Sequence, residues 1–195
     1  MIRVAGLLTV LFVVTHTLND DERKKILDFH TQIRSKVQPT ASKMMLMKYS
    51  KKLEALAEKW VKLCKYAHPN PQQNPEYKNL GQNLAISGGW APDVKWLSQG
   101  WADEVKYYTY KNNSCTPGKA CGHYTQMVWS TSKELGCAIN RCDNIFPPWP
   151  KPIYLLACQY SPPGNVIGKK PYAQGDTCSK CPPLYKCVDG QCSRK

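Results

Sequence analysis

Residues 121–129, with the sequence CGHYTQMVW, contain the side chains that point most directly to chemistry. His123 supplies an imidazole, a ring that can exchange a proton or bind a metal ion through a ring nitrogen. Gly122 leaves the backbone free to turn just before it. The apolar residues that follow indicate a buried segment, which we interpret as a strand preceded by a tight turn.

Four motifs resemble signatures of the CAP superfamily, which includes cysteine-rich secretory proteins, antigen 5 venom allergens and plant pathogenesis-related class 1 proteins. They are residues 122–129, residues 155–166 (LLACQYSPPGNV), residues 81–84 (GQNL) and residues 30–34 (HTQIR), where Thr31 departs from the family's usual asparagine. They occur in the family's order, and the similarity is greatest to the venom allergen-like branch. The resemblance implies an α+β fold, a three-layer α-β-α sandwich.

The resemblance also implies a central cleft with two histidines and two acidic residues. His123, Glu104 and His68 match three of these residues, whereas Gln82 stands where many relatives have glutamate. Two imidazoles suit zinc or another divalent ion, but the missing carboxylate removes a negative charge and a supporting partner. We therefore expect no required cofactor, and any divalent site should be weak and rest on His68 and His123. The alternative is a polar cluster that only satisfies its own hydrogen bonds.

Catalysis is not expected from these residues. A hydrolase needs a nucleophile, a base that activates it and a group that orients the base. His123 and Glu104 could act as base and orienting group, but no hydroxyl is marked as a nucleophile, and Gln82 cannot act as a general base. The sequence therefore predicts no catalytic residue.

Lipid binding is the preferred function. CAP proteins are associated with sterols and fatty acids such as palmitate, and aromatic side chains in irregular loops can cover a flat apolar ligand. Such residues occur next to the loop that carries Asn112 and around the proline-rich run 146–152, and they form the predicted lipid-binding set: Tyr107, Tyr108, Tyr110, Phe146, Trp149 and Tyr154. The apolar stripes of the first and third helices could leave a slot for an acyl chain, although such stripes usually form core. The alternative is an extracellular signalling or immunomodulatory module that acts through its protein surface.

Helices and strands must position these side chains. Apolar spacing and N-terminal acids predict helices over 20–37, 50–67 and 93–108. Strands are predicted over 124–129, 135–139 and 153–159, with a short ordered stretch at 81–86 that ends at 87–89. His30 lies beside the apolar face of the first helix, where we expect a structural role. Helices first and antiparallel strands last agree with an α+β fold.

The N-terminus and the cysteines indicate export. Residues 1–17 read as a secretory signal peptide whose apolar run is too short to span a bilayer, so we expect a secreted protein without a membrane anchor. Asn112 begins a glycosylation acceptor. The ten cysteines agree with an oxidising compartment. The resemblance implies the pairs Cys64–Cys142, Cys115–Cys121 and Cys137–Cys158, and it leaves open the pairing of Cys178, Cys181, Cys187 and Cys192.

We therefore divide the chain into a signal (1–17), a CAP domain (18–173) and a cysteine-rich, hinge-like tail (174–195). Its formal net charge is +13. The basic residues are concentrated in 23–65, where they would favour anionic glycans or an anionic lipid surface, or only aid solubility. Nucleic acid is disfavoured because the chain lacks a reader motif.

Overall fold

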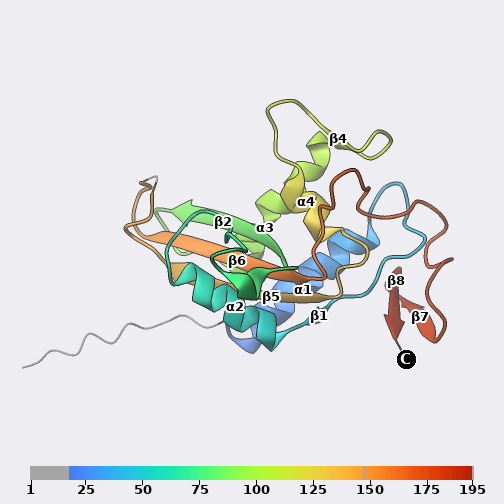
Figure 1. Cartoon of the computed structure of the whole chain (residues 1–195), viewed down its shortest axis with the longest axis horizontal. Coiled ribbons are helices and arrows are strands. Elements are labelled where there is room, and N and C mark those ends of the chain that lie inside the picture. The colour runs from blue at the N-terminus through green and yellow to red at the C-terminus, as the bar shows by residue number, and fades with distance from the viewer. Residues whose placement is uncertain (1–17, 147, 195) are drawn as a thin grey trace, which may run out of the picture.

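A computed structural model describes residues 18–146 and 148–194, so the expected signal peptide lies outside the described residues. All four α-helices precede strand β5, and the last four elements are strands (Figure 1). The helices are α1 (Asp20–Ser35), α2 (Lys51–Val61), α3 (Val94–Asp103) and α4 (Gly122–Met127), with short 3-10 turns η1 (Pro75–Tyr77) and η2 (Glu104–Tyr107). The strands are β1 (Lys48–Tyr49), β2 (Gly81–Gly88), β3 (Tyr108–Thr109), β4 (Ser114–Cys115), β5 (Glu134–Arg141), β6 (Ile153–Ser161), β7 (Tyr185–Val188) and β8 (Gln191–Arg194).

The main sheet has the strand order β1-β5-β6-β2. β6 pairs antiparallel with both β5 and β2, while the short β1 runs parallel to β5. β6 is buried along almost its whole length, which explains why its sequence, IYLLACQYS, lacks the alternation of a half-exposed strand. β2 and β1 form the two edges, and β2 is the edge next to the site described below.

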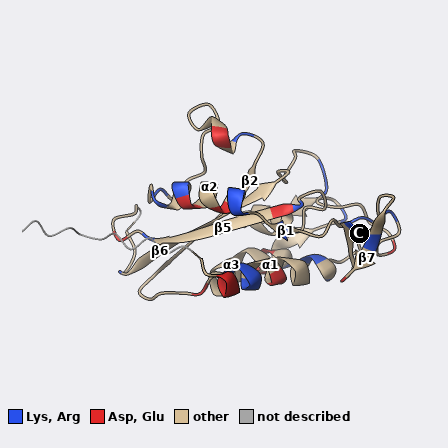
Figure 2. Ribbon diagram, turned by 90° about the horizontal axis from the view of Figure 1, so that it is seen from below, with Lys and Arg blue, Asp and Glu red and all other residues tan. Residues whose placement is uncertain are grey.

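Helices cover both faces of this sheet, which confirms the α-β-α sandwich (Figure 2). α2 packs on one face, where Ala57 and Trp60 join Leu155 and Ala157 of β6 in one core cluster. α1, α3 and α4 cover the other face around Leu156, Cys158 and Tyr160. Alternate residues of β6 therefore supply the two cores, as the period of a strand requires. A Cβ on Gly136 of β5 would lie 2.2 Å from the backbone nitrogen of Glu54, so this glycine lets α2 approach the sheet.

The predicted strand over 124–129 is wrong, because residues 122–127 form helix α4. Tyr124, Met127 and Val128 are buried at the i, i+3, i+4 spacing of a helix face, and a strand would have put Tyr124 and Met127 on opposite sides. The remaining differences concern element ends. α2 stops at Val61, because Cys64 has a φ of 50°, and α3 gives way to η2 after Asp103. β2 continues through the predicted break to Gly88.

Disulfides staple the tail internally, and backbone hydrogen bonds such as those between Cys192 and the carbonyl of Met44 and between Leu46 and the carbonyl of Cys192 hold it against the domain. The structure pairs Cys64–Cys142, Cys115–Cys121 and Cys137–Cys158 as the resemblance implies, and it pairs Cys178 with Cys187 and Cys181 with Cys192. β7 and β8 form a hairpin within the tail, for which the sequence predicted no strand. Across the described residues, no helix has both the length and the apolar character needed to cross a bilayer.

Candidate functional site

His123 is positioned by helix α4 and by Glu104 of the preceding turn. The carboxylate of Glu104 accepts hydrogen bonds from the backbone N–H groups of His123 and Tyr124, at 2.9 and 3.1 Å. Its other oxygen lies 2.6 Å from Nδ1 of His123. Glu104 therefore satisfies the free donors at the start of α4 and orients the imidazole at the same time.

The ring of His123 is held on its other side by Trp101 of α3. The two rings stack with centroids 6.2 Å apart and an interplanar angle of 15°. The indole of Trp101 donates to the carbonyl of Leu84 on edge strand β2, at 2.9 Å. Because Nδ1 of a neutral His123 donates to Glu104, its Nε2 carries a lone pair that can accept a proton or bind a ligand.

His68 and Gln82 form a second pair. Nδ1 of His68 lies 2.9 Å from Oε1 of Gln82, so a neutral His68 donates there and also keeps its lone pair on Nε2. His68 is exposed, whereas Nε2 of Gln82 is buried and has no hydrogen-bond partner among the described residues. An oxygen acceptor from a bound molecule would satisfy this donor.

The four residues of the predicted cleft thus form two hydrogen-bonded pairs. Glu104 and His123 line a groove of about 460 Å³ beside β2, and His68 and Gln82 line a smaller one of about 210 Å³. In the described part of the chain, the only three His, Cys, Asp or Glu side chains with ligand atoms within 4.8 Å of one another are Cys178, Cys181 and Cys192. All three are in disulfides, so Glu104, His68 and His123 do not form a compact three-ligand metal site.

The larger groove is mainly apolar. It runs between β2 and α3 and is lined by Leu84, Ala85, Ile86, Leu97 and Gly100, by the aromatic residues Tyr66, Trp96, Trp101 and Trp149, and by the polar residues Gln99, Asp103, Glu104 and His123. Trp96 and Trp149 are 55% and 43% exposed, so their rings form walls that are open to solvent. The groove thus combines aromatic walls with one polar end.

Two of the predicted lipid-binding residues, Trp149 and Tyr108, line hollows among the described residues. Trp149 lines the groove beside β2, and Tyr108 lines a separate hollow of about 300 Å³ next to the loop that carries Asn112. Tyr110 stacks on Tyr172, and Phe146 is 84% exposed. Lys106 and Lys119 lie over the ring of Tyr107, and the partly buried Tyr154 packs against the core. The apolar stripes of α1 and α3 join one core cluster, as their spacing allowed.

Sequence reasoning missed the aromatic walls supplied by Tyr66 and Trp96. Trp96 lies on the exposed face of α3, where polar residues are expected. A tryptophan at such a position was the feature of the sequence that could have indicated this wall. Tyr66 follows α2, and burial together with the nearby charge of Glu104 raises its pKa. Asn112 is exposed, as a glycosylation acceptor requires.

A family model described as the cysteine-rich secretory protein family, CAP, matches residues 27–160. The chain belongs to the CAP family. The matched range contains all four cleft residues, both edge strands and three of the four helices completely.

Several CAP relatives match most of the chain. Peptidase inhibitor 16 of Mus musculus is 37% identical over 178 residues, covering 91% of this chain and 35% of the relative. Peptidase inhibitor 15 of Xenopus laevis is 40% identical over 190 residues, covering 90% of this chain and 71% of the relative. The chain thus spans about a third of the length of the peptidase inhibitor 16 relatives.

Solved CAP structures include Na-ASP-1, with a TM-score of 0.76 and 30% identity over 92% of this chain and 49% of that one. The structure of NaASP2 with Zn²⁺ has a TM-score of 0.73 and 29% identity, covering 91% of this chain and 98% of that one. Venom allergen-like protein 4 of Schistosoma mansoni has a TM-score of 0.65 and 27% identity, covering 84% of this chain and all of that one. These similarities confirm the fold and the venom allergen-like resemblance.

Proposed function

We propose that this CAP protein is an extracellular, non-enzymatic protein that binds a small apolar ligand, a sterol or a fatty acid, in the groove beside β2. The observation that carries the proposal is the groove itself. Its volume of about 460 Å³ falls within the roughly 300–1,000 Å³ of small-molecule sites, and such sites are mostly apolar with a few polar groups.

The polar end of the groove favours a neutral hydroxyl over a carboxylate. Glu104 is only 8% exposed, and its negative charge would repel the head group of an ionised fatty acid. A sterol hydroxyl could instead donate to Nε2 of His123 while its rings lie against Trp96 and Trp149. Within the proposed class, the groove therefore favours the sterol.

The test compares two aromatic residues that the sequence assigned to the same role. Trp149→Ala should weaken binding of a labelled sterol by about tenfold, because a groove wall is lost. Phe146→Ala is the matched control, because Phe146 does not line the groove. An equal loss of sterol affinity in both variants would place the ligand on the loop that carries them. An unchanged affinity in both variants would show that the groove does not bind the sterol.

Native mass spectrometry of the secreted protein, followed by organic extraction, separates lipid binding from the surface-interaction alternative. A co-purifying sterol or acyl chain supports the proposal. A ligand-free mass, together with failure to take up added labelled lipid, would favour a signalling or immunomodulatory module that binds an extracellular protein.

A weak divalent-metal site at His68 and His123 is a second proposal. It is supported by the free Nε2 lone pair of each neutral imidazole and by the Zn²⁺ in the NaASP2 structure. Calorimetric zinc titration should lose most of its heat when both histidines are changed to alanine. The two single variants would show whether one ion is shared, and an unchanged isotherm in the double variant would place the ion elsewhere.

A further inference from the structure

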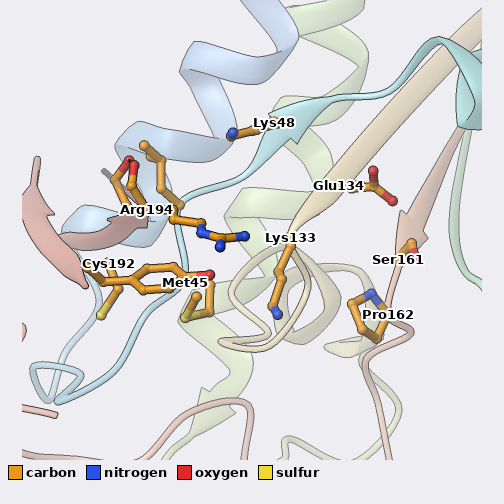
Figure 3. A pocket seen from close by; sticks show the side chains of 11 residues that line it. Met45, Lys48, Lys133, Glu134, Ser161, Pro162, Cys192 and Arg194 are labelled. Carbon is orange, nitrogen blue, oxygen red and sulfur yellow. Dashed lines mark hydrogen bonds between the residues drawn. The ribbon is translucent and has the colours of Figure 1, made fainter. Parts of the chain in front are cut away.

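A hollow of about 270 Å³ lies where the C-terminal tail meets the end of the main sheet (Figure 3). It shares no lining residue with the groove beside β2 or with the hollow at His68. Its lining comes from three places: residues 45–48, which lead into β1, the start of β5 with the end of β6, and the tail hairpin. The residues are Met45, Leu46, Lys48, Lys133, Glu134, Ser161, Pro162, Tyr185, Cys192, Ser193 and Arg194.

Backbone hydrogen bonds fix the walls of this tail pocket. The N–H of Lys48 donates to the carbonyl of Lys133 at 2.8 Å, and the N–H of Lys133 donates to the carbonyl of Ser161 at 2.8 Å. On the tail side, the N–H of Cys192 donates to Met44, and the N–H of Leu46 donates to the carbonyl of Cys192 at 3.0 Å. The disulfide between Cys181 and Cys192 holds the same strand. The cationic side chains therefore extend from an ordered backbone.

Three cations and one carboxylate, that of Glu134, line the pocket, and none of the four is paired with a described residue. Lys48, Lys133 and Arg194 form no side-chain hydrogen bond or ion pair with any described residue, and neither does Glu134. By contrast, Arg23, Lys59 and Arg141 each pair with a carboxylate. Figure 3 shows the guanidinium of Arg194 extending from the tail strand towards Lys133. Three unpaired cations against one carboxylate leave the hollow with a net positive potential, which attracts an oxyanion.

The other wall is apolar. Met45 is buried, Tyr185 is half-buried, and Pro162 completes this side. The volume lies just below the range of roughly 300–1,000 Å³ that drug-sized ligands need, so the pocket can take one ring and one anionic group but not an acyl chain or an oligosaccharide.

The geometry points to a binding site for a small apolar or aromatic group that carries one sulfate or phosphate monoester. Arg194 and Lys133 contact the ester oxygens, with Lys48 adding to the positive potential, and Met45, Tyr185 and Pro162 contact the apolar body. The site is independent of lipid binding in the groove beside β2.

The experiment titrates the full chain with phenyl sulfate, phenyl phosphate and inorganic phosphate, followed by amide NMR shifts of the pocket residues. Each phenyl ester should bind at least about fivefold more tightly than inorganic phosphate, because its ring buries against the apolar wall. Binding should weaken as salt is added, because the cations are exposed. The ratio of the two esters identifies whether the natural group is a sulfate or a phosphate.

The variant Lys133→Gln/Arg194→Gln should lose about tenfold or more in affinity for both esters. The matched control, Lys52→Gln/Lys62→Gln, changes the net charge equally at exposed positions of α2 and its end. An equal loss in the control would show bulk charge attraction and overturn the site. The site would also be overturned if neither ester shifted the pocket amides at millimolar concentration, or if inorganic phosphate bound as tightly as the esters.

Discussion

His30 illustrates how one side chain can be essential to this fold without taking part in binding. It is completely buried on α1, with Nδ1 2.7 Å from the carbonyl of Ile26 and Nε2 2.8 Å from the hydroxyl of Tyr160. Nδ1 must donate to the carbonyl, so Nε2 accepts from Tyr160. Asn83 in turn donates to that hydroxyl and to the carbonyl of His123, so a chain of polar contacts links α1 to the candidate site.

This contact chain predicts a pH-dependent stability. Burial lowers the pKa of His30 to about 4, whereas the imidazole of an unfolded chain titrates near 6.5. Between these values the unfolded state binds more protons, so the free energy of unfolding should fall as the pH drops from about 6.5 to 4. The full contribution is on the order of 3 kcal/mol.

The measurement is the unfolding midpoint of the unaltered protein and of His30→Gln at a series of pH values in this window. The variant should be less stable at neutral pH, and its curve should be flatter than that of the unaltered protein between pH 6.5 and 4. Parallel curves for the two proteins would show that His30 does not carry the pH dependence.

At the scale of the element, α4 depends on a carboxylate from outside the helix. The helix has only six residues, and its N-cap residue, Cys121, forms no side-chain capping bond. Helices this short are marginal by themselves. Glu104 replaces the missing cap, since it accepts from the N–H groups of both His123 and Tyr124.

Glu104→Gln should therefore destabilise the protein by about 1–2 kcal/mol, because a neutral amide is a weaker acceptor at a helix N-terminus. Amide hydrogen exchange at His123 and Tyr124 should accelerate by roughly 5–30-fold. The control is Asp103→Asn at the neighbouring exposed position, which should change stability by no more than about 0.5 kcal/mol. Unchanged exchange at both amides would mean that tertiary packing alone holds α4.

The helices and strands differ in how far the sequence alone could predict them. α1 and the strands β5 and β6 follow from local apolar spacing and from capping, since Asn19 and Glu22 form a capping box at the start of α1. The prediction of a strand at α4 was wrong because it used only the residues of that segment. Glu104, which stabilises the helix, lies outside the segment, in η2. The division of the cleft residues into two hydrogen-bonded pairs could not be predicted either, because it depends on tertiary distances.

At the scale of the whole molecule, the concentration of basic residues in 23–65 does not form one continuous face. α1 and α2 carry many of these residues and lie on opposite sides of the sheet (Figure 2). Several are also neutralised, since Arg23 and Lys51 both pair with Glu54, and Lys59 pairs with Glu76. Binding to anionic glycans or lipid surfaces through the N-terminal helices remains a prediction. Because the sheet separates α1 from α2, the basic residues of the two helices would face different partners or different parts of one partner.

Arg34 joins the parts of the molecule that the sequence separates. It is 1% exposed, and its guanidinium donates to the carbonyls of Met127, Trp129, Met45 and Ser132 and to the side chain of Gln191. These acceptors belong to the end of α4 and the segment after it, the crossing before β1, and β8 of the tail. One side chain of α1 thus connects the helical layer, the segment before β1 and the cysteine-rich tail.

Arg34→Lys should consequently destabilise the protein by about 3–5 kcal/mol, because an ammonium cannot reproduce the planar set of donors and would leave buried carbonyls unpaired. The matched control is Arg141→Lys, in an exposed pair with Asp143, whose loss should change stability far less because solvent screens the pair. Urea unfolding with the disulfides intact measures both changes. Amide exchange at Leu46 and Cys192 should accelerate in Arg34→Lys alone, since their hydrogen bonds join the tail to the domain. Similar costs for the two variants, with unchanged exchange at these amides, would show that backbone contacts hold the tail on the domain without help from Arg34.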